Sequence, residues 1–127
     1  EFVLVEGVGG WAAPITVALD QADLVRALDV PVILVVGLRL GCINHSRLSA
    51  QAIHSDGLRL LGWIGNTIDP EFERCAETVA ILDRCIPAPR LGLLPHAPDM
   101  AAAGGAAALS AAAAVLAHFR QGAAHVA

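Results

Sequence analysis

Glu6 stands directly after an apolar segment and directly before a run rich in glycine. Residues 3–11 read VLVEGVGGW, so a buried strand over Phe2–Val5 would carry the carboxylate of Glu6 at its tip. A carboxylate in that place is a natural ligand, direct or through water, for a hard cation such as Mg²⁺ that carries substrate phosphates. A solvated loop glutamate before a glycine turn has the same pattern, so the motif alone leaves both readings open.

The stretch Gly41-Cys42-Ile43-Asn44-His45 has the pattern of a helix start that could bind an anion. A glycine lets the backbone turn, and the first amides of a helix have no carbonyl partner within it. Such amides bind phosphate or carboxylate. In the alternative reading, Asn44 or Ser46 caps the helix and nothing binds. We interpret His45 as a hydrogen-bonding residue rather than a general base.

Two further polar sites follow apolar segments. Asn66 ends the stretch GWIGN, and its side-chain amide offers a donor and an acceptor that match the N6/N7 edge of adenine. Asparagine is also common in turns, because it tolerates left-handed backbone. Pro95-His96-Ala97 closes another apolar segment, where a loop held by proline could support a flat base or could simply be a connection.

These residues need a sheet that brings them together, and the chain has the alternation of strands and helices that builds one. Predicted strands cover Phe2–Val5, Val30–Val36, Leu58–Ile64 and Arg90–Leu94. Predicted helices cover Asp20–Leu28, Asn44–Ser55 and Glu71–Arg84. The pattern predicts an α/β fold with right-handed crossovers and helices flanking a parallel sheet. Ligands of such sheets bind beyond the carboxyl ends of the strands, where all four polar sites lie.

Composition restricts the function further. The 127 residues suffice for one domain with a core, and 56% of them are hydrophobic. A net charge of -4 argues against a nucleic-acid partner, because phosphate neutralisation needs a basic excess. All eight basic residues are arginines, so the chain contains no lysine. The three cysteines form no C-x-x-C pair and no secretory signal is visible, which favours a reduced, cytoplasmic setting.

The two ends of the chain differ from its middle. We predict a compact domain over residues 1–97 and an Ala/Gly-rich tail or helix over residues 98–127. The apolar run Ala101–Ala117 is short and alanine-rich for a membrane span, so we expect no membrane association. The chain begins at Glu1 without methionine, and we expect a further segment upstream.

The motifs in their order resemble the dethiobiotin synthetase family. The resemblance rests on VLVEGVGGW, VPVILVVGLRLGCINHSRLSAQAI, GWIGN and IPAPRLGLLP, and it covers residues 3 to about 97. The stretch VGLRLGCINH is the most specific. The chain resembles only the C-terminal portion of such an enzyme.

The resemblance implies a P-loop NTPase-like, three-layer α/β fold that is incomplete at the N-terminus, and a homodimer. It implies ATP- and Mg²⁺-dependent closure of a cyclic urea. A carbamate forms from 7,8-diaminopelargonate and CO2, ATP phosphorylates the carbamate, and the second amine displaces phosphate to give dethiobiotin. We expect the fragment alone to be inactive, and we assign no catalytic residue to it.

The resemblance also implies roles for particular residues. Glu6 corresponds to a metal-associated glutamate, with Gly7, Val8 and Gly9 lining the nucleotide or carbamate. The implied adenine-binding residues are Asn66 and Thr67, helped by Pro95, His96 and Ala97. The implied site for the substrate carboxylate, reached across the dimer, is Gly41, Cys42, Ile43 and Asn44.

The chain departs from the family pattern in two ways. The phosphate-binding motif G-x-x-x-x-G-K-[ST] is absent, and a chain without lysine cannot contain it. Relatives often carry a tyrosine where this chain has Thr78. Two other functions remain open: a related P-loop amidoligase of the cobyrinic acid type, and a non-catalytic remnant that binds nucleotide or dimerises.

Overall fold

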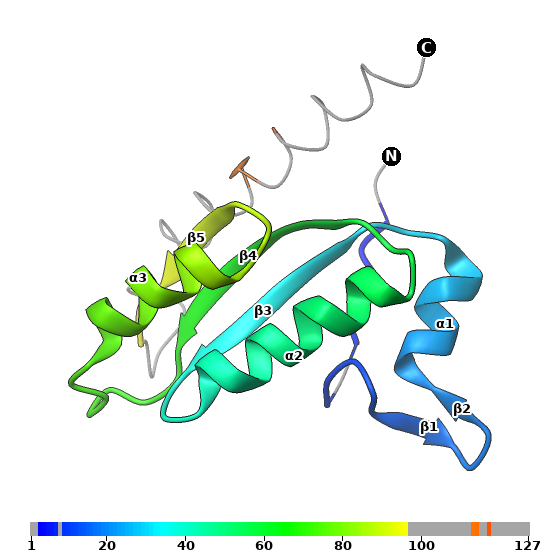
Figure 1. Cartoon of the computed structure of the whole chain (residues 1–127), viewed down its shortest axis with the longest axis horizontal. Coiled ribbons are helices and arrows are strands. Elements are labelled where there is room, and N and C mark those ends of the chain that lie inside the picture. Colours follow the sequence, from blue (N-terminus) through cyan, green and yellow to red (C-terminus); the bar gives the residue numbers. More distant parts are fainter. Residues whose placement is uncertain (1–2, 8, 97–112, 115–116, 118–127) are drawn as a thin grey trace.

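The chain folds around a three-stranded parallel sheet (Figure 1). A computed structural model describes residues 3–7, 9–96, 113–114 and 117. The strands lie in the order β3 (Val32–Leu38), β4 (Leu60–Thr67) and β5 (Arg90–Leu94). They are joined by α2 (Cys42–Ser55) and α3 (Cys75–Cys85). Each parallel connection therefore runs through a helix, as the alternating apolar and amphipathic segments predicted.

Helices α2 and α3 lie side by side and cover one face of the sheet (Figure 1). Leu38, Trp63 and Leu82 are fully buried between these layers. Val36 and Val79 belong to the same core cluster, so alternate residues of β3 face the helices. The side chain of Val35 points to the opposite face and is 60% exposed. Within the described part of the chain, α2 and α3 form a helical layer on a single face.

The N-terminal part forms a small unit of its own. An antiparallel hairpin, β1 (Pro14–Thr16) and β2 (Leu19–Asp20), leads directly into α1 (Gln21–Leu28). Asp20 is the N-cap of α1, and its backbone NH donates to the Asp23 carboxylate over 2.7 Å. The helix was predicted from Asp20 to Leu28, and the structure confirms it. The hairpin was not predicted, because its two strands have only three and two residues.

The predicted α/β fold with a parallel sheet is confirmed, but two elements differ from expectation. The strand predicted over Phe2–Val5 is wrong for its described residues, since Val3–Val5 pair with no strand and are exposed. An apolar segment becomes a strand only where another strand accepts its backbone hydrogen bonds.

The helix predicted over Glu71–Arg84 begins later, at Cys75. The backbone NH of Glu71 donates to the Asp69 side chain over 3.0 Å, and Phe72 NH donates to the Asp69 carbonyl over 3.3 Å. These two bonds hold the chain after Pro70 in a turn, so the helix cannot start there.

No helix in the described ranges is long and apolar enough to cross a membrane. Most of Ala101–Ala117 lies outside the described residues, and so does most of the predicted tail. The division into residues 1–97 and 98–127 therefore stays a prediction.

Candidate functional site

The carboxyl ends of the three strands lie at one edge of the sheet. In the register of the sheet, Leu38 of β3 is opposite Thr67 of β4, and Asn66 of β4 is opposite Leu94 of β5. The loops after these strands begin at Arg39, Ile68 and Pro95. Two of the predicted groups, the anion site and the adenine site, are thereby brought to the same edge.

The residues predicted to bind adenine are neighbours across β4 and β5. Asn66 and Thr67 are half-buried at the end of β4, and the Asn66 side chain makes no hydrogen bond to any described residue. Pro95 and His96 follow the partner strand directly and are exposed. An unpaired amide beside a short exposed loop can bind the edge of a base. Ala97 lies outside the described residues.

The start of α2 has the features of an anion site. Gly41 is its N-cap with φ 90°, a conformation that favours glycine, and no side chain caps the helix. Cys42 NH donates to the Arg39 carbonyl and His45 NH to Gly41, but among the described residues the amides of Ile43 and Asn44 have no acceptor. These two donors and the positive end of the helix dipole together favour an anion.

The alternative, in which a side chain caps this helix, is wrong. The Ser46 hydroxyl donates to the Cys42 carbonyl over 2.6 Å, so it points back along the helix. The Asn44 side chain bonds no backbone amide in the described part of the chain. His45 is exposed and makes no side-chain hydrogen bond to the described residues, and nothing assigns it a role.

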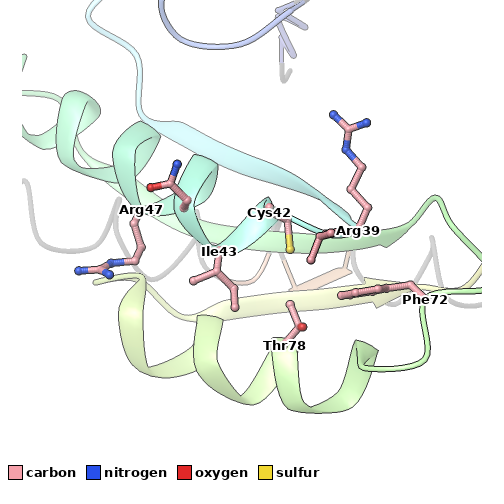
Figure 2. A pocket seen from close by; sticks show the side chains of 9 residues that line it. Arg39, Cys42, Ile43, Arg47, Phe72 and Thr78 are labelled. Carbon is pink, nitrogen blue, oxygen red and sulfur yellow. The ribbon is translucent and has the colours of Figure 1, made fainter.

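A pocket of about 310 Å³ opens at this helix start, between α2 and α3 (Figure 2). Its wall includes residues 41–44, with Phe72 and Thr78 on the α3 side. Figure 2 shows Ile43 and Thr78 facing one another across the pocket, with the Phe72 ring extending toward Thr78. Arg39 and Arg47 also line the pocket, with their guanidinium groups directed away from Ile43 and Thr78. A pocket with free amides beside an apolar wall fits an anionic group carried on an apolar body.

The glycine-rich loop lies against α1. A Cβ atom added to Gly7 would fall 2.0 Å from the Gln21 amide nitrogen, so a side chain at position 7 would displace Gln21. Gly9 has φ 87° and therefore favours glycine. Glu6 is exposed and makes no ion pair or hydrogen bond within the described ranges. No hydrogen bond or ion pair among the described residues ties Glu6 to the sheet edge, so its role stays a prediction. Val8 lies outside the described residues.

The loop is anchored at its far end by Trp11. The indole Nε1 donates to Asp56 Oδ2 over 2.7 Å, and Arg26 donates to Asp56 Oδ1 over 2.7 Å. Asp56 is the C-cap of α2, at the opposite end of that helix from the pocket. The pKa of Asp56 is lowered, first by the hydrogen bond from Trp11 and then by Arg26. The pKa of Arg26 is raised, mainly by its hydrogen bond to Asp56.

The part of the chain that the structure describes contains no group of three or more His, Cys, Asp or Glu side chains placed to hold a metal ion. Mg²⁺ is commonly held by one or two carboxylates together with substrate phosphates and water. The exposed carboxylate of Glu6 fits that requirement as one ligand of a site completed by other groups. It does not form a metal site by itself.

Five residues of the pocket wall were not predicted as site residues from the sequence: Arg39, Leu40, Arg47, Phe72 and Thr78. Arg47 lies one helical turn after Ile43, so its spacing from the predicted site could have indicated it. Thr78 was noted only as a departure from the family pattern. Phe72 gave no signal, because residue 72 was expected inside a helix.

Comparison with known proteins shows the family of the chain. A family described as an AAA domain matches residues 1–103, most of the chain. The chain belongs to this family. The P-loop NTPase-like fold that the family resemblance implied is therefore confirmed for the part that is present.

Individual relatives show which members of this family the chain resembles. The chain is 60% identical over 98 residues to the ATP-dependent dethiobiotin synthetase BioD of Xylella fastidiosa (strain 9a5c), covering 77% of this chain and 43% of the relative. It is 58% identical over 103 residues to the protein of that name in Xanthomonas oryzae pv. oryzae (strain PXO99A), covering 81% and 46%. The resemblance to dethiobiotin synthetases is confirmed. The chain spans less than half the length of these relatives.

Proposed function

We propose that the chain is part of an ATP-dependent dethiobiotin synthetase. The reaction joins 7,8-diaminopelargonate and CO2 with ATP to give dethiobiotin, ADP and phosphate, through a carbamate and its phosphorylated anhydride. The observation that carries the proposal is the identity of 58–60% to relatives of that name over 98 to 103 residues. The ligase class follows from those relatives.

The sheet edge is proposed to hold the nucleotide. The free amide of Asn66, with Thr67 and the adjoining loop at Pro95, His96 and Ala97, would bind adenine. Glu6 would contribute one oxygen ligand to Mg²⁺, with Gly7, Val8 and Gly9 lining the phosphates or the carbamate. Bound Mg²⁺ supplies charge neutralisation to the phosphates. The side chains named here only bind and orient.

The start of α2 is proposed to receive the carboxylate of 7,8-diaminopelargonate. The unpartnered amides of Ile43 and Asn44 support this role, since they can donate to a carboxylate without breaking any bond of the helix. In a homodimer, Gly41–Asn44 of one copy would face the nucleotide site of the other. Two copies would then form two such composite sites.

The chain alone is proposed to be inactive. Phosphoryl transfer needs positive charge on the transferred group, and the 127 residues contain neither a lysine nor a P-loop motif. We expect the purified chain to give no ATP-dependent ring closure. Adding a companion, which is a separate N-terminal segment of a dethiobiotin synthetase that carries the P-loop, should restore ring closure. The measurement is the amount of dethiobiotin formed together with the ADP released.

The control for this assay is the same companion with its P-loop lysine changed to alanine, which should restore nothing. Robust turnover by the chain without any companion would overturn the proposal that it is incomplete.

The three cysteines are free, which supports a reducing compartment, and we propose the cytoplasm.

Two other functions predict different binding. An amidoligase of the cobyrinic acid type would bind nucleotide but not 7,8-diaminopelargonate. A remnant that only dimerises would bind nucleotide weakly or not at all. Calorimetry with each ligand on the chain and its companion separates them, because only the synthetase should bind both.

A further inference from the structure

The N-terminal unit, described over residues 3–7 and 9–29, stands beside the three-stranded sheet rather than within it. It contains the glycine-rich loop, the hairpin of β1 and β2, and α1 with its C-cap Asp29. The hairpin is a sheet of its own, separate from β3, β4 and β5. Figure 1 shows α1 beside the C-terminal end of α2. The contacts between this unit and α2 therefore decide where Glu6 lies relative to the ends of the strands.

Every hydrogen bond between the N-terminal unit and the rest of the described chain ends on one carboxylate, that of Asp56. Trp11 Nε1 donates to Asp56 Oδ2 and Arg26 Nη1 donates to Asp56 Oδ1, each over 2.7 Å. The other hydrogen bonds of the unit in the described ranges join residues within it. The Asp56 side chain is only 24% exposed, so water and salt screen these two bonds less than they would at the open surface.

The glycine-rich loop is fixed to the first turn of α1. Ala22 NH donates to the Trp11 carbonyl over 3.1 Å. At the other end of the loop, the Gln21 side chain packs against Gly7 and leaves no room there for a Cβ atom. Glu6 directly precedes Gly7, so the position of α1 sets the position of the Glu6 backbone.

Asp56 itself belongs to the part of the chain that packs on the sheet. It is the C-cap of α2, and Ala50 and Ile53 of that helix are buried. Arg26 also pairs with Asp23 in its own helix. Loss of Asp56 would therefore leave Arg26 with a partner on α1, and no described hydrogen bond would then join the N-terminal unit to α2.

We propose that Asp56 is a positioning residue: through Trp11 and Arg26 it holds the N-terminal unit, and with it the backbone of Glu6, in one orientation on the sheet. A displacement of about 1 Å can cost a site much of its activity, so a fixed orientation matters to a ligand that one carboxylate helps to hold. The proposal rests on the proposed function only for the role of Glu6 at Mg²⁺. Asp56 acts through the loop and touches neither metal nor nucleotide.

Residual dipolar couplings measure this orientation on the whole 127-residue chain, without ATP or companion. In the unaltered chain, one alignment tensor should fit the amide couplings of α1 and those of β3, β4 and β5. In Asp56→Ala, α1 should need a tensor of its own with a smaller magnitude, because the unit then moves relative to the sheet. A role in stability alone would lower the free energy of unfolding and leave a single tensor.

Variants of the two donors show whether both bonds contribute. Trp11→Phe removes the indole NH and Arg26→Met removes the guanidinium group, while each leaves the other bond to Asp56 in place. Each should reduce the α1 couplings less than Asp56→Ala does. If Asp56→Ala does not fold, these two variants decide, since unreduced α1 couplings in both would overturn the proposal. The matched control is Asp83→Ala, which breaks the ion pair of Asp83 with Arg90 between α3 and β5 and should leave one tensor.

A second measurement follows the proposed metal ligand. With the companion present, Asp56→Ala should raise the Mg²⁺ concentration for half-maximal ring closure about tenfold. The KM for 7,8-diaminopelargonate should change less than about twofold, since its proposed site lies at the opposite end of α2 from Asp56.

A single tensor in Asp56→Ala would overturn the proposal, because apolar contacts such as that of the buried Ala22 would then suffice to fix the unit. An unchanged Mg²⁺ requirement, or an equal rise in both constants, would overturn the link to Glu6. The proposed function fails separately. Absence of ring closure by the unaltered chain with its companion would overturn the synthetase assignment, while separate tensors in Asp56→Ala would still support the positioning by Asp56.

Discussion

Asp56 connects the glycine-rich loop to the helix that forms the pocket. It accepts a hydrogen bond from Trp11 and another from Arg26, and both favour its charged form. Its pKa is therefore lowered in the folded chain. A lowered pKa stabilises the fold at pH values above the ordinary value of about 4, and this stabilisation is lost as pH falls through the folded pKa.

Replacing Asp56 with asparagine should lower the free energy of unfolding at pH 7, because the charge that holds Trp11 and Arg26 is removed. The difference between the two proteins should shrink as the pH falls below about 4. Urea unfolding at pH 7, 5, 4 and 3 measures it. Asp29→Asn is the control, since Asp29 is exposed at the end of α1 and makes no ion pair among described residues. A difference that does not change with pH would contradict this account.

At the scale of single residues, the sequence located the ends of the strands and the start of α2 better than it located contacts between side chains. Gly41 and the polar residues after the predicted strands indicated where α2 begins and where β4 ends, at Asn66. Ligands of parallel sheets bind beside the loops at such strand ends. The sequence could not predict the hydrogen bond between Trp11 and Asp56, because the two residues lie 45 positions apart. It also could not decide whether Asn44 capped α2, since that depends on where Gly41 turns the backbone.

At the scale of elements, the packing of α3 against the sheet fixes the position of one wall of the pocket. Leu82 is fully buried against the sheet, whereas Leu48 on α2 is 56% exposed. We expect Leu82→Ala to lower the free energy of unfolding by about 3 kcal/mol, through lost burial and the cavity left behind. Leu48→Ala makes the same chemical change on the surface and should cost less than about 0.5 kcal/mol. Urea denaturation followed by circular dichroism measures both, and similar losses would contradict the assigned core.

The elements themselves were predictable where their causes are local. The apolar runs that became β3 and β4 were found, with bounds off by two or three residues, and β5 was found at Arg90–Leu94. The start of α3 was not found, because the Asp69 side chain holds the preceding turn. The strand expected over Phe2–Val5 is absent at its described residues, Val3–Val5, for a non-local reason: strand formation requires a neighbouring strand.

At the scale of the whole molecule, the proposed site is divided between copies. In the proposed homodimer, each copy would carry a nucleotide half at Glu6 and Asn66 and a carboxylate half at the start of α2. Glu6→Gln would damage the first half. Asn44→Asp would damage the second, because it places a negative charge beside the amides, while an acid in the first turn still suits the helix.

Mixing the two variants tests whether the halves meet across a dimer. With the companion segment present, each variant alone should have little ring-closing activity. In an equal mixture, half of the dimers contain one copy of each, and each of these has one site with both halves intact, so about a quarter of full activity should return. If both halves came from one copy, no intact site would form and the mixture would stay as inactive as its components. Gln51→Glu in place of Asn44→Asp is the control, because it adds an acid to an exposed position of α2 away from the pocket and should leave activity unchanged.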